Sequence, residues 1–441
     1  MKNIRKWRVA AVLAGALVLS ACSAGSLGSS SGGDGDGGGE TLSFLVDNGE
    51  SSVALAEALA EDFNASGTGT TVEVETRPAG TEGDNLVKTR LATGDMTDVF
   101  MYNSGSLFQA LTPDRQLTPL TDEAWVGSLD EDFREAVTAG GDVYGVPFGS
   151  SAAGGVLYHR PTYEQLGLQV PTTWDQFMAN NAAIAAAGFA QVSETFKTTW
   201  TSQLFVLADY HNVATAEPGF AEDYTAGQVR YATSPAAIQG FQHLQDVHTA
   251  GFQNTDFASA TDADGLRMVA TGEGAHYPML TSAVIQMVLN NPEAAQDVGF
   301  FGLPGTDAAT NGTTTWLSSG IYVPTTTEGA RLDAAREFLT WVASPAGCES
   351  AQRATPPTGP FLVDGCELPA DVPQAVADVQ AYYDSGSTTP ALEFASPVKG
   401  PGLEQITVEV GAGIRSAADG AALYDEDVRQ QAQQLGLPGW D

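Results

Sequence analysis

The sequence predicts an α/β protein built from two lobes, and three observations support this. A chain of 441 residues is too long for one ordinary hydrophobic core. Strand-type and helix-type hydrophobic patterns alternate between residues 41 and 101, which is typical of mostly parallel sheets. Residues 149–155 (GSSAAGG) are small and conformationally permissive and separate two β-type runs. Such a segment suits a strand that leaves one lobe, passes an open crevice and enters another, although an ordinary loop is the alternative.

The elements of the first part of the chain follow from hydrophobic spacing. Leu55, Leu59 and Phe63 recur on one helix face, and Val72 and Val74 alternate as in a strand. The expected succession is a strand over 41–46, a helix through 55–63, a strand at 72–74, a helix through 86–91 and a strand over 98–101.

The second half of the chain is expected to contain several helices. Thr173 can cap a helix that runs through Phe177 and Ile184, and Pro235 suits the first turn of another. Further helices are expected near 204–207, 235–247, 266–270 and 334–341, and the C-terminal region is expected to be helical with loops. The chain shows no internal repeat.

The N-terminus has the pattern of a secretory signal. Basic residues precede an apolar stretch over 9–21, so residues 1–21 are expected to be removed. Leu19-Ser20-Ala21-Cys22 resembles the lipobox of bacterial lipoproteins, which implies that Cys22 becomes an acylated N-terminus held at a membrane. A plain signal peptide with a chance cysteine is the alternative. Residues 22–40, rich in Gly, Ser and Asp after the cysteine, are expected to be a flexible tether.

The charge balance argues against a nucleic-acid partner. The formal net charge is −35, and four of the 19 basic residues precede Cys22 whereas none of the 54 acidic residues does. A chain this acidic repels nucleic acid and gains solubility from its charge.

Two of the three cysteines form a candidate pair. Cys348 and Cys366 flank a segment rich in Pro and Gly, and outside the cytoplasm a disulfide is their expected state. Two thiols alone are an improbable metal site.

Known catalytic motifs are missing from the sequence. It has no G-x-S-x-G, no H-E-x-x-H and no G-x-x-x-x-G-K. His243 and His248 are poorly spaced for one metal ion, and residues 262–265 resemble only half of a calcium loop. We therefore expect no enzyme activity, no cofactor and no metal, although a pair of carboxylates suited to glycoside hydrolysis cannot be located from sequence.

Several motifs resemble the sugar-binding class of ABC-importer solute-binding proteins, relatives of maltose-binding protein. YGVPF at 144–148, PTTWDQF at 171–177 and WLSSGIYVP at 316–324 carry this resemblance through most of the mature chain. GEGAHYPM at 272–279 also resembles a hinge crossing of the family. The Gly and Trp that usually follow are replaced here by Leu280 and Ser282, so no stacking tryptophan is expected at that point.

The resemblance implies a two-lobe periplasmic-binding-protein-like fold of type II topology. Its sheets are expected to be mixed and mostly parallel, with three hinge crossings near 150–155, 275–280 and 320–325. The implied division places 41–150 and 280–322 in lobe 1, and 151–279 and 323–441 in lobe 2.

Candidate ligand-binding residues come from strand ends and crossings. Ligands lie beyond the carboxyl ends of parallel strands, and sugar sites combine aromatic rings with polar side chains. Trp200 and Trp316 stand among Thr and Ser near element ends, whereas Trp174 and Trp341 are expected in cores. The candidates are Asp47, Asn48, Glu50, Tyr102, Asn103, Ser150, Ser151, Trp200, Tyr277, Trp316 and Ser318. For the polar ones, a helix cap is the alternative role.

The resemblance implies an extracytoplasmic, lipid-anchored, monomeric component of an ABC importer. It would capture a sugar, such as a short oligosaccharide, by hinge closure and deliver it to the transmembrane permease subunits. Two alternatives stay open. One is a secreted lipoprotein enzyme acting on polysaccharide, and the other is the same fold binding a peptide or a polyol.

Overall fold

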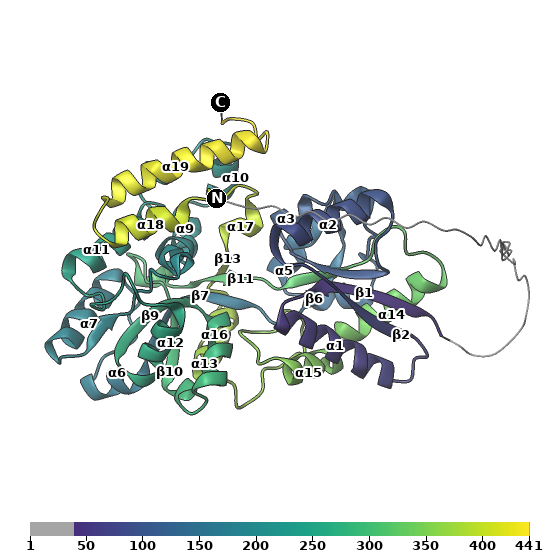
Figure 1. Cartoon of the computed structure of the whole chain (residues 1–441), viewed down its shortest axis with the longest axis horizontal. Helices are drawn as coiled ribbons and strands as arrows, with labels where there is room; N and C mark the ends of the chain where they lie inside the picture. The colour runs from purple at the N-terminus through teal and green to yellow at the C-terminus, as the bar shows by residue number, and fades with distance from the viewer. Residues whose placement is uncertain (1–38, 441) are drawn as a thin grey trace, which may run out of the picture. The chain divides into compact units, whose positions relative to one another are not determined.

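Two mixed β-sheets, each covered by helices, organise residues 39–440, which the computed structural model describes (Figure 1). The predicted signal peptide, Cys22 and the tether up to residue 38 lie outside the described residues. Glu40 is already part of the fold, because its carbonyl accepts a hydrogen bond from the Thr71 amide at 2.9 Å.

The first sheet has the strand order β2-β1-β3-β12-β6. β1 pairs in parallel with β2 and β3, while β12 runs antiparallel to β3 and β6. We call this sheet and the core around it the first lobe. The strands are β1 (Thr41–Asp47), β2 (Thr71–Arg77), β3 (Val99–Tyr102), β6 (Gly145–Phe148) and β12 (Ser319–Tyr322), and β4 (Thr138–Ala139) and β5 (Asp142–Val143) form a separate hairpin.

The second sheet is built around β7, with the order β13-β11-β7-β9-β8 and β10 also paired to β7. β9 pairs with one edge of β7. β11 and β10 pair with the other edge, one after the other, and all three strands run antiparallel to β7. We call this sheet and its cores the second lobe. Its strands are β7 (Ala152–His159), β8 (Ala190–Val192), β9 (Gly274–Leu280), β10 (Val298–Gly302), β11 (Thr313–Trp316) and β13 (Thr388–Pro390).

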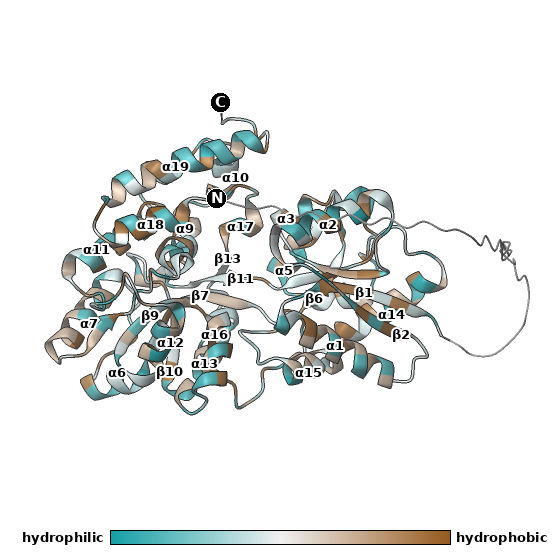
Figure 2. Cartoon of the chain, in the orientation of Figure 1, coloured by the Kyte–Doolittle hydropathy of each residue, from teal (hydrophilic) through white to brown (hydrophobic). Residues whose placement is uncertain are grey.

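Helices bury one apolar face against each sheet. In the first lobe, Leu55, Leu59 and Phe63 of α1 are buried at the predicted spacing, and α1 lies beside α15, far away in sequence (Figure 1). Figure 2 shows hydrophobic residues along the strands of the first sheet and on part of α1. The helices packed around this lobe are α1 (Glu50–Ala65), α2 (Gly80–Thr93), α3 (Ser106–Gln109), α4 (Pro113–Gln116), α5 (Glu131–Ala136), α14 (Ala330–Val342) and α15 (Pro345–Ala354), with a 3-10 turn at Ala124–Ser128.

The second lobe carries the remaining helices. Thr173 caps α7 as predicted, because its side chain accepts a hydrogen bond from the Gln176 amide. The helices are α6 (Arg160–Leu166), α7 (Trp174–Ala186), α8 (Leu204–Leu207), α9 (Tyr210–Ala216), α10 (Phe220–Thr225), α11 (Gln239–Ala250), α12 (Asp262–Thr271), α13 (Val284–Asn290), α16 (Gln374–Asp384), α17 (Leu392–Ala395), α18 (Leu403–Gly411) and α19 (Ala417–Gln434). The 3-10 turns are η2 (Thr199–Gln203), η3 (Thr281–Ala283), η4 (Ala294–Asp297) and η5 (Ala308–Thr310).

The predicted division into lobes needs two corrections. Residues 280–316, expected in lobe 1, belong to the second lobe, because β10 and β11 pair with β7 and α13 packs in the same core. Residues 323–363, expected in lobe 2, belong to the first lobe, because α14 and α15 pack against α1 and Leu362 and Val363 join the first core. The sheets are mixed, as expected, but antiparallel pairs are as frequent as parallel ones in the first sheet and more frequent in the second.

Two short segments carry the chain between the sheets. Residues 149–151, the first linker, connect β6 to β7, as the small residues predicted. Residues 317–318, the second linker, connect β11 to β12, just before the predicted crossing at 320–325. The expected crossing at 275–280 is wrong, since β9 and the helix after it stay in the second lobe. The chain instead returns to the second lobe between Val363 and α16.

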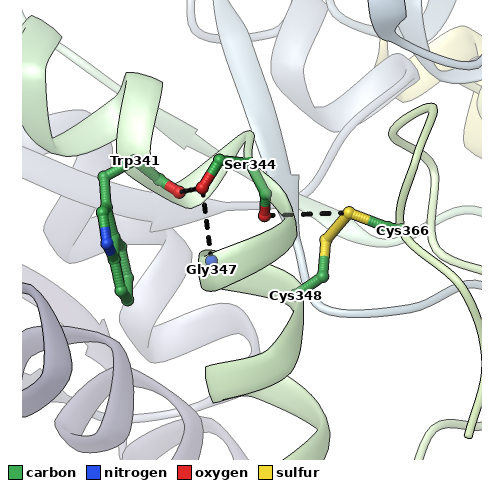
Figure 3. The surroundings of a disulfide bond; sticks show 5 residues. All are labelled: Trp341, Ser344, Gly347, Cys348 and Cys366. Atoms are coloured by element: carbon green, nitrogen blue, oxygen red, sulfur yellow. Dashed lines mark hydrogen bonds between the residues drawn. A yellow bond between two sulfur atoms is a disulfide. The ribbon is translucent and has the colours of Figure 1, made fainter.

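Cys348 and Cys366 form a disulfide, as predicted (Figure 3). Cys348 lies in α15, whose N-terminus is capped by Ser344 through the Gly347 amide, and Ser344 Oγ also donates to the Trp341 carbonyl. The bond closes a loop across a sequence separation of 18 residues. It thereby fixes the segment 355–365 to the first lobe.

Candidate functional site

The second linker borders a cavity of 350 Å³ between the two lobes. β3 ends beside this linker, so Asn103 and Ser104 line the cavity from the first lobe, and Ser104 Oγ donates to the Ser318 carbonyl at 2.9 Å. Trp316 and the segment after α17 line it from the second lobe. The full lining is Asn103, Ser104, Ser106, Leu107, Trp316, Leu317, Ser318, Ser319, Glu393, Phe394, Ser396, Pro397 and Lys399.

Trp316 is the larger of the two aromatic residues that line this cavity, the other being Phe394. It is the last residue of β11 and is partly exposed. One edge of its ring packs so closely on Gly154 of β7 that a Cβ built there would lie 2.3 Å from the ring. Its Nε1 donates to Glu393 Oε1 at 2.9 Å. The indole is therefore held on two sides and still borders the cavity.

Glu393 and Lys399 are site residues that the sequence did not predict. Their side chains form an ion pair with 3.6 Å between Lys399 Nζ and Glu393 Oε2, and both line the cavity. Glu393 contacts Trp316 across 77 residues of sequence, and the loop-rich C-terminal region shows no strong periodicity. The local sequence indicates a site here only through an acidic and an aromatic residue, Glu393 and Phe394, between Pro390 and Pro397.

The short helix α17 connects the lobes beside the cavity. Phe394 packs against the core of the first lobe, whereas Leu392 packs against that of the second. Ser106 Oγ donates to the Glu393 carbonyl at 2.6 Å. A Cβ built on Gly105 would lie 2.7 Å from Phe394 Cα, so only glycine allows this approach.

A larger cavity, of 560 Å³, adjoins the first one, since Leu317 and Phe394 line both. Carboxylates enter it from both lobes, namely Asp132 and Glu135 of α5 and Glu222 of α10. Burial and the neighbouring acids, Asp130 first among them, raise the pKa of Asp132 to about 6. No Lys or Arg lines this cavity.

The candidates at the end of β1 lie elsewhere and make local contacts. Asp47 Oδ1 accepts a hydrogen bond from the Gly49 amide at 2.8 Å, and Asn48 Oδ1 accepts one from the Ala79 amide at 3.1 Å. Glu50 is exposed in the first turn of α1, where an acidic side chain suits the helix dipole. These contacts match the capping alternative, and the three residues line neither cavity.

The first linker uses its hydroxyl groups within the protein. Ser151 is fully buried, and its amide and its Oγ both donate to the Pro360 carbonyl, at 2.9 and 3.0 Å. Ser150 Oγ accepts from the Thr358 amide at 3.0 Å. The prediction that these hydroxyls face a ligand is therefore not supported by their contacts.

Tyr102 and Tyr277 are core residues. Tyr102 has no exposed surface, and burial holds the pKa of its hydroxyl well above the usual value. Tyr277 is 1% exposed, and its hydroxyl lies 2.9 Å from Thr195 Oγ1. A position at a strand end does not determine which face of the sheet a side chain takes. Both rings are buried in cores and line neither interlobe cavity.

Trp200 remains an exposed aromatic residue in the second lobe. It lies in η2 and is 38% exposed, more than Trp174 at 8%, which is a core residue as predicted. Trp200 lines neither interlobe cavity. Of the eleven candidates, the structure thus brings Asn103, Trp316 and Ser318 together at one cavity.

The described residues, 39–440, contain no cluster of three or more His, Cys, Asp or Glu side chains arranged to hold a metal ion. Among their helices, none combines the length and apolar character needed to cross a bilayer.

Comparison with known proteins identifies the family. The family described as bacterial extracellular solute-binding protein matches residues 47–347, and the chain therefore belongs to it. The members and structural relatives are substrate-binding proteins rather than enzymes, and the family is extracytoplasmic. The Multiple sugar-binding protein of Streptococcus mutans serotype c is 29% identical over 98 residues. That match spans 22% of this chain and only 23% of the relative's length.

Solved structures share the fold over nearly the whole chain. The binding protein MsmE of Bacillus subtilis, in an open conformation, has a TM-score of 0.74 and 17% identity, covering 91% of this chain and 100% of that one. The apo form of RafE from Streptococcus pneumoniae has a TM-score of 0.73 and 19% identity, covering 89% and 99%. RafE in complex with raffinose has a TM-score of 0.69 and 18% identity, covering 88% and 99%.

Proposed function

We propose that this protein captures a sugar between its two lobes and delivers it to an ABC importer. The observation that carries the proposal is the 350 Å³ cavity in which an indole stands beside amide, hydroxyl and charged side chains. Sugars need this combination, because they present one apolar ring face and several hydroxyl groups. The printed names of relatives point the same way, since one binds raffinose and another chitin oligosaccharide.

Five of the lining residues have a stated role in this proposal. Trp316 supplies the aromatic face, and Glu393 and Lys399 supply an acceptor and a donor for hydroxyl groups. Asn103 and Ser318 complete the polar set from the side of the first lobe. Ser318 lines the cavity, and its Oγ is buried without a hydrogen-bond partner among the described residues, so we expect it to reach a ligand hydroxyl only when the lobes move.

Closure of the lobes would complete the site. The two linkers are short, and rotation about them would bring further second-lobe residues, Trp200 among them, toward the sugar. The TM-score is 0.74 with MsmE in an open conformation and 0.69 with RafE in complex with raffinose, which supports an open starting state. Compaction in solution scattering on addition of sugar is the expected result, and an unchanged radius at saturation would contradict closure.

The proposal includes a membrane anchor, a permease partner and no chemistry of its own. Cys22 would carry the lipid, residues 23–38 would act as a tether, and the partner ATPase would supply the energy of transport. Cys22→Ser should abolish incorporation of a labelled fatty acid. Unchanged incorporation would refute the anchor without affecting the binding proposal.

Calorimetric titration tests the ligand class. Raffinose, a chitin oligosaccharide, a polyol and a short peptide are each titrated, and the ligand is then recovered and analysed. We expect a saturable signal with a sugar that is recovered intact. Binding of the polyol or peptide alone would select the same fold with another ligand, and cleavage of a polysaccharide would select the enzyme alternative.

Trp316→Phe tests the role of the indole ring, with Trp341→Phe as the matched control. Trp341 packs against the first core, with its ring centroid 5.8 Å from that of Phe63, and lines no interlobe cavity. Loss of the larger ring and of the Glu393 hydrogen bond should weaken sugar binding about tenfold, or about 1.4 kcal/mol. Trp341→Phe should leave affinity unchanged, and equal affinity in both variants would remove Trp316 from the site.

A further inference from the structure

The larger interlobe cavity, of 560 Å³, collects carboxylates without a basic side chain to balance them. Asp132 and Glu135 of α5 line it from the first lobe and Glu222 of α10 from the second, whereas neither Lys nor Arg is part of the lining. None of the three carboxylates takes part in an ion pair among residues 39–440. Like charges around one space repel each other, and the repulsion grows as the lobes approach. A positive charge between them would relieve it.

These carboxylates are accessible, and burial does not remove their charge. Glu135 and Glu222 are exposed, and Asp132 is half-buried. Burial and the neighbouring acids raise the pKa of Asp132 to about 6, which still leaves this carboxyl mostly ionised at neutral pH. The cavity therefore presents negative charge to an occupant.

Tyr210, the first residue of α9, supplies an independent observation at the same cavity. It is 6% exposed and lines the cavity. Burial and, second, the Glu222 carboxylate raise the pKa of its hydroxyl to about 12, and no hydrogen bond among the described residues contributes. Unlike the hydroxyl of Tyr224, it is not fully enclosed by protein atoms. A hydroxyl in this position needs a partner from outside the described residues, and its oxygen can accept an N–H.

The position of the cavity beside the sugar site indicates which kind of molecule brings the charge. The two interlobe cavities adjoin, because Leu317 and Phe394 line both. The rings of Phe394 and Tyr210 offer apolar surface of the kind that packs on a sugar ring. A second sugar unit, linked to the one beside Trp316, therefore fits this lining better than a separate small ion does.

We propose that this cavity holds a sugar unit with a protonated amino group, so that the ligand is a cationic amino-sugar oligosaccharide. The inference rests on the proposed sugar-binding function and names its substrate class. The ammonium group would lie between Asp132 and Glu222, and one of its N–H groups would donate to Tyr210 Oη. Because the acids belong to different lobes, the same charge would favour closure.

Calorimetric titration at neutral pH tests the charge with three β-1,4-linked trisaccharides that differ only at C2. They are built of glucosamine, glucose and N-acetylglucosamine, and carry an ammonium, a hydroxyl and an acetamido group. We expect the glucosamine form to bind at least tenfold more tightly than the glucose form, and acetylation to abolish this advantage because it removes the charge. The advantage should shrink as sodium chloride rises from about 0.05 to about 0.5 M. Equal affinity for the glucosamine and glucose forms would overturn the inference.

Charge-removing variants locate the ammonium group, and the readout is the ratio of glucosamine to glucose affinity. Asp132→Asn, at a half-buried position, should lower the ratio about tenfold, and Glu222→Gln, at an exposed one, about two- to fivefold. Tyr210→Phe removes only the hydroxyl and should lower the ratio about threefold. Asp223→Asn is the control, because it removes an equal charge from an exposed position of α10 outside the lining, and it should keep the parent ratio.

The outcomes separate this inference from the function on which it rests. Saturable binding of the glucose form with no preference for the amino form would leave the sugar-binding proposal standing and overturn this one. A preference that survives in both Asp132→Asn and Glu222→Gln would show that the charge is read elsewhere, and the inference would be wrong. Failure of every sugar to bind, raffinose included, would overturn both proposals.

Discussion

The two linkers between the sheets both contain serine but differ in how their polar groups are used. In the first linker, the amide and hydroxyl of Ser151 bind Pro360, and Ser150 binds Thr358. In the second linker, Ser318 Oγ lacks a partner among the described residues, and Ser318 lines a cavity beside Trp316. The segment 358–361, more than 200 residues downstream of the first linker, accounts for this difference.

This comparison assigns different roles to the two linkers. A linker whose hydrogen bonds are satisfied internally contributes to stability, whereas one with a free hydroxyl can contribute to ligand binding. Changes at the first linker should therefore affect the free energy of unfolding, and changes at the second should affect affinity.

A change of pH should have the largest effect on the free energy of unfolding. It acts through Glu194, which lies outside both linkers. Glu194 is fully buried in the second lobe, and burial raises the pKa of its carboxyl from 4.5 to about 8. The folded protein keeps this proton at pH values where the unfolded chain has lost it. The contribution of Glu194 to the free energy of unfolding should therefore fall as pH rises from about 5 to about 8, by on the order of a few kcal/mol.

Denaturant melts across this pH range measure the effect, and Glu194→Gln is the matched variant. The amide cannot ionise, so its stability should depend less on pH than that of the parent. An identical pH profile in both proteins would show that Glu194 is not the source of the effect.

Loss of the disulfide should affect stability and spare affinity. The Cys348–Cys366 bond fixes the segment that satisfies the first linker. Replacing both cysteines by serine should lower the free energy of unfolding by about 3 kcal/mol in the chain-entropy picture. Chemical denaturation measures this change. A weaker sugar affinity with unchanged stability would reverse the roles we assign to the linkers.

Gly154→Ala should lower both the free energy of unfolding and the sugar affinity, because it changes the packing under Trp316. The added Cβ would meet the indole at 2.3 Å and Ala208 Cβ at 3.2 Å. Overpacking of this kind costs about 1–3 kcal/mol, and displacement of the ring should weaken sugar binding as well. Ala153→Gly on the same strand is a control that adds no volume. Unchanged affinity in Gly154→Ala would indicate that the ring position does not matter to the ligand.

Local patterns in the sequence predicted the elements but not their partners. The spacing of Leu55, Leu59 and Phe63 fixes a helix face wherever that helix packs, and small residues correctly marked the first linker. The side on which Tyr102 and Tyr277 lie depends on tertiary packing, and both proved to be core residues. Glu393 was missed for the same reason, because its contact with Trp316 spans 77 residues. The division at 280–322 failed because strand pairing is not visible in the local pattern.

The smallest expected effects come from a pair of hydroxyl deletions, one at each linker. Thr358→Val removes the donor to the Ser151 carbonyl, a bond of 2.7 Å, with little change in shape. It should lower the free energy of unfolding by about 1–2 kcal/mol, since the carbonyl is left buried without this donor, and should leave sugar affinity unchanged. Ser318→Ala removes a hydroxyl that has no partner among the described residues, so stability should not fall. Its sugar affinity should fall by about fivefold, the equivalent of one hydrogen bond of about 1 kcal/mol. Melts and titrations give the free energy of unfolding and the sugar affinity of each variant. A loss of stability in Ser318→Ala together with a loss of affinity in Thr358→Val would show that the two linkers do not differ in the way their contacts indicate.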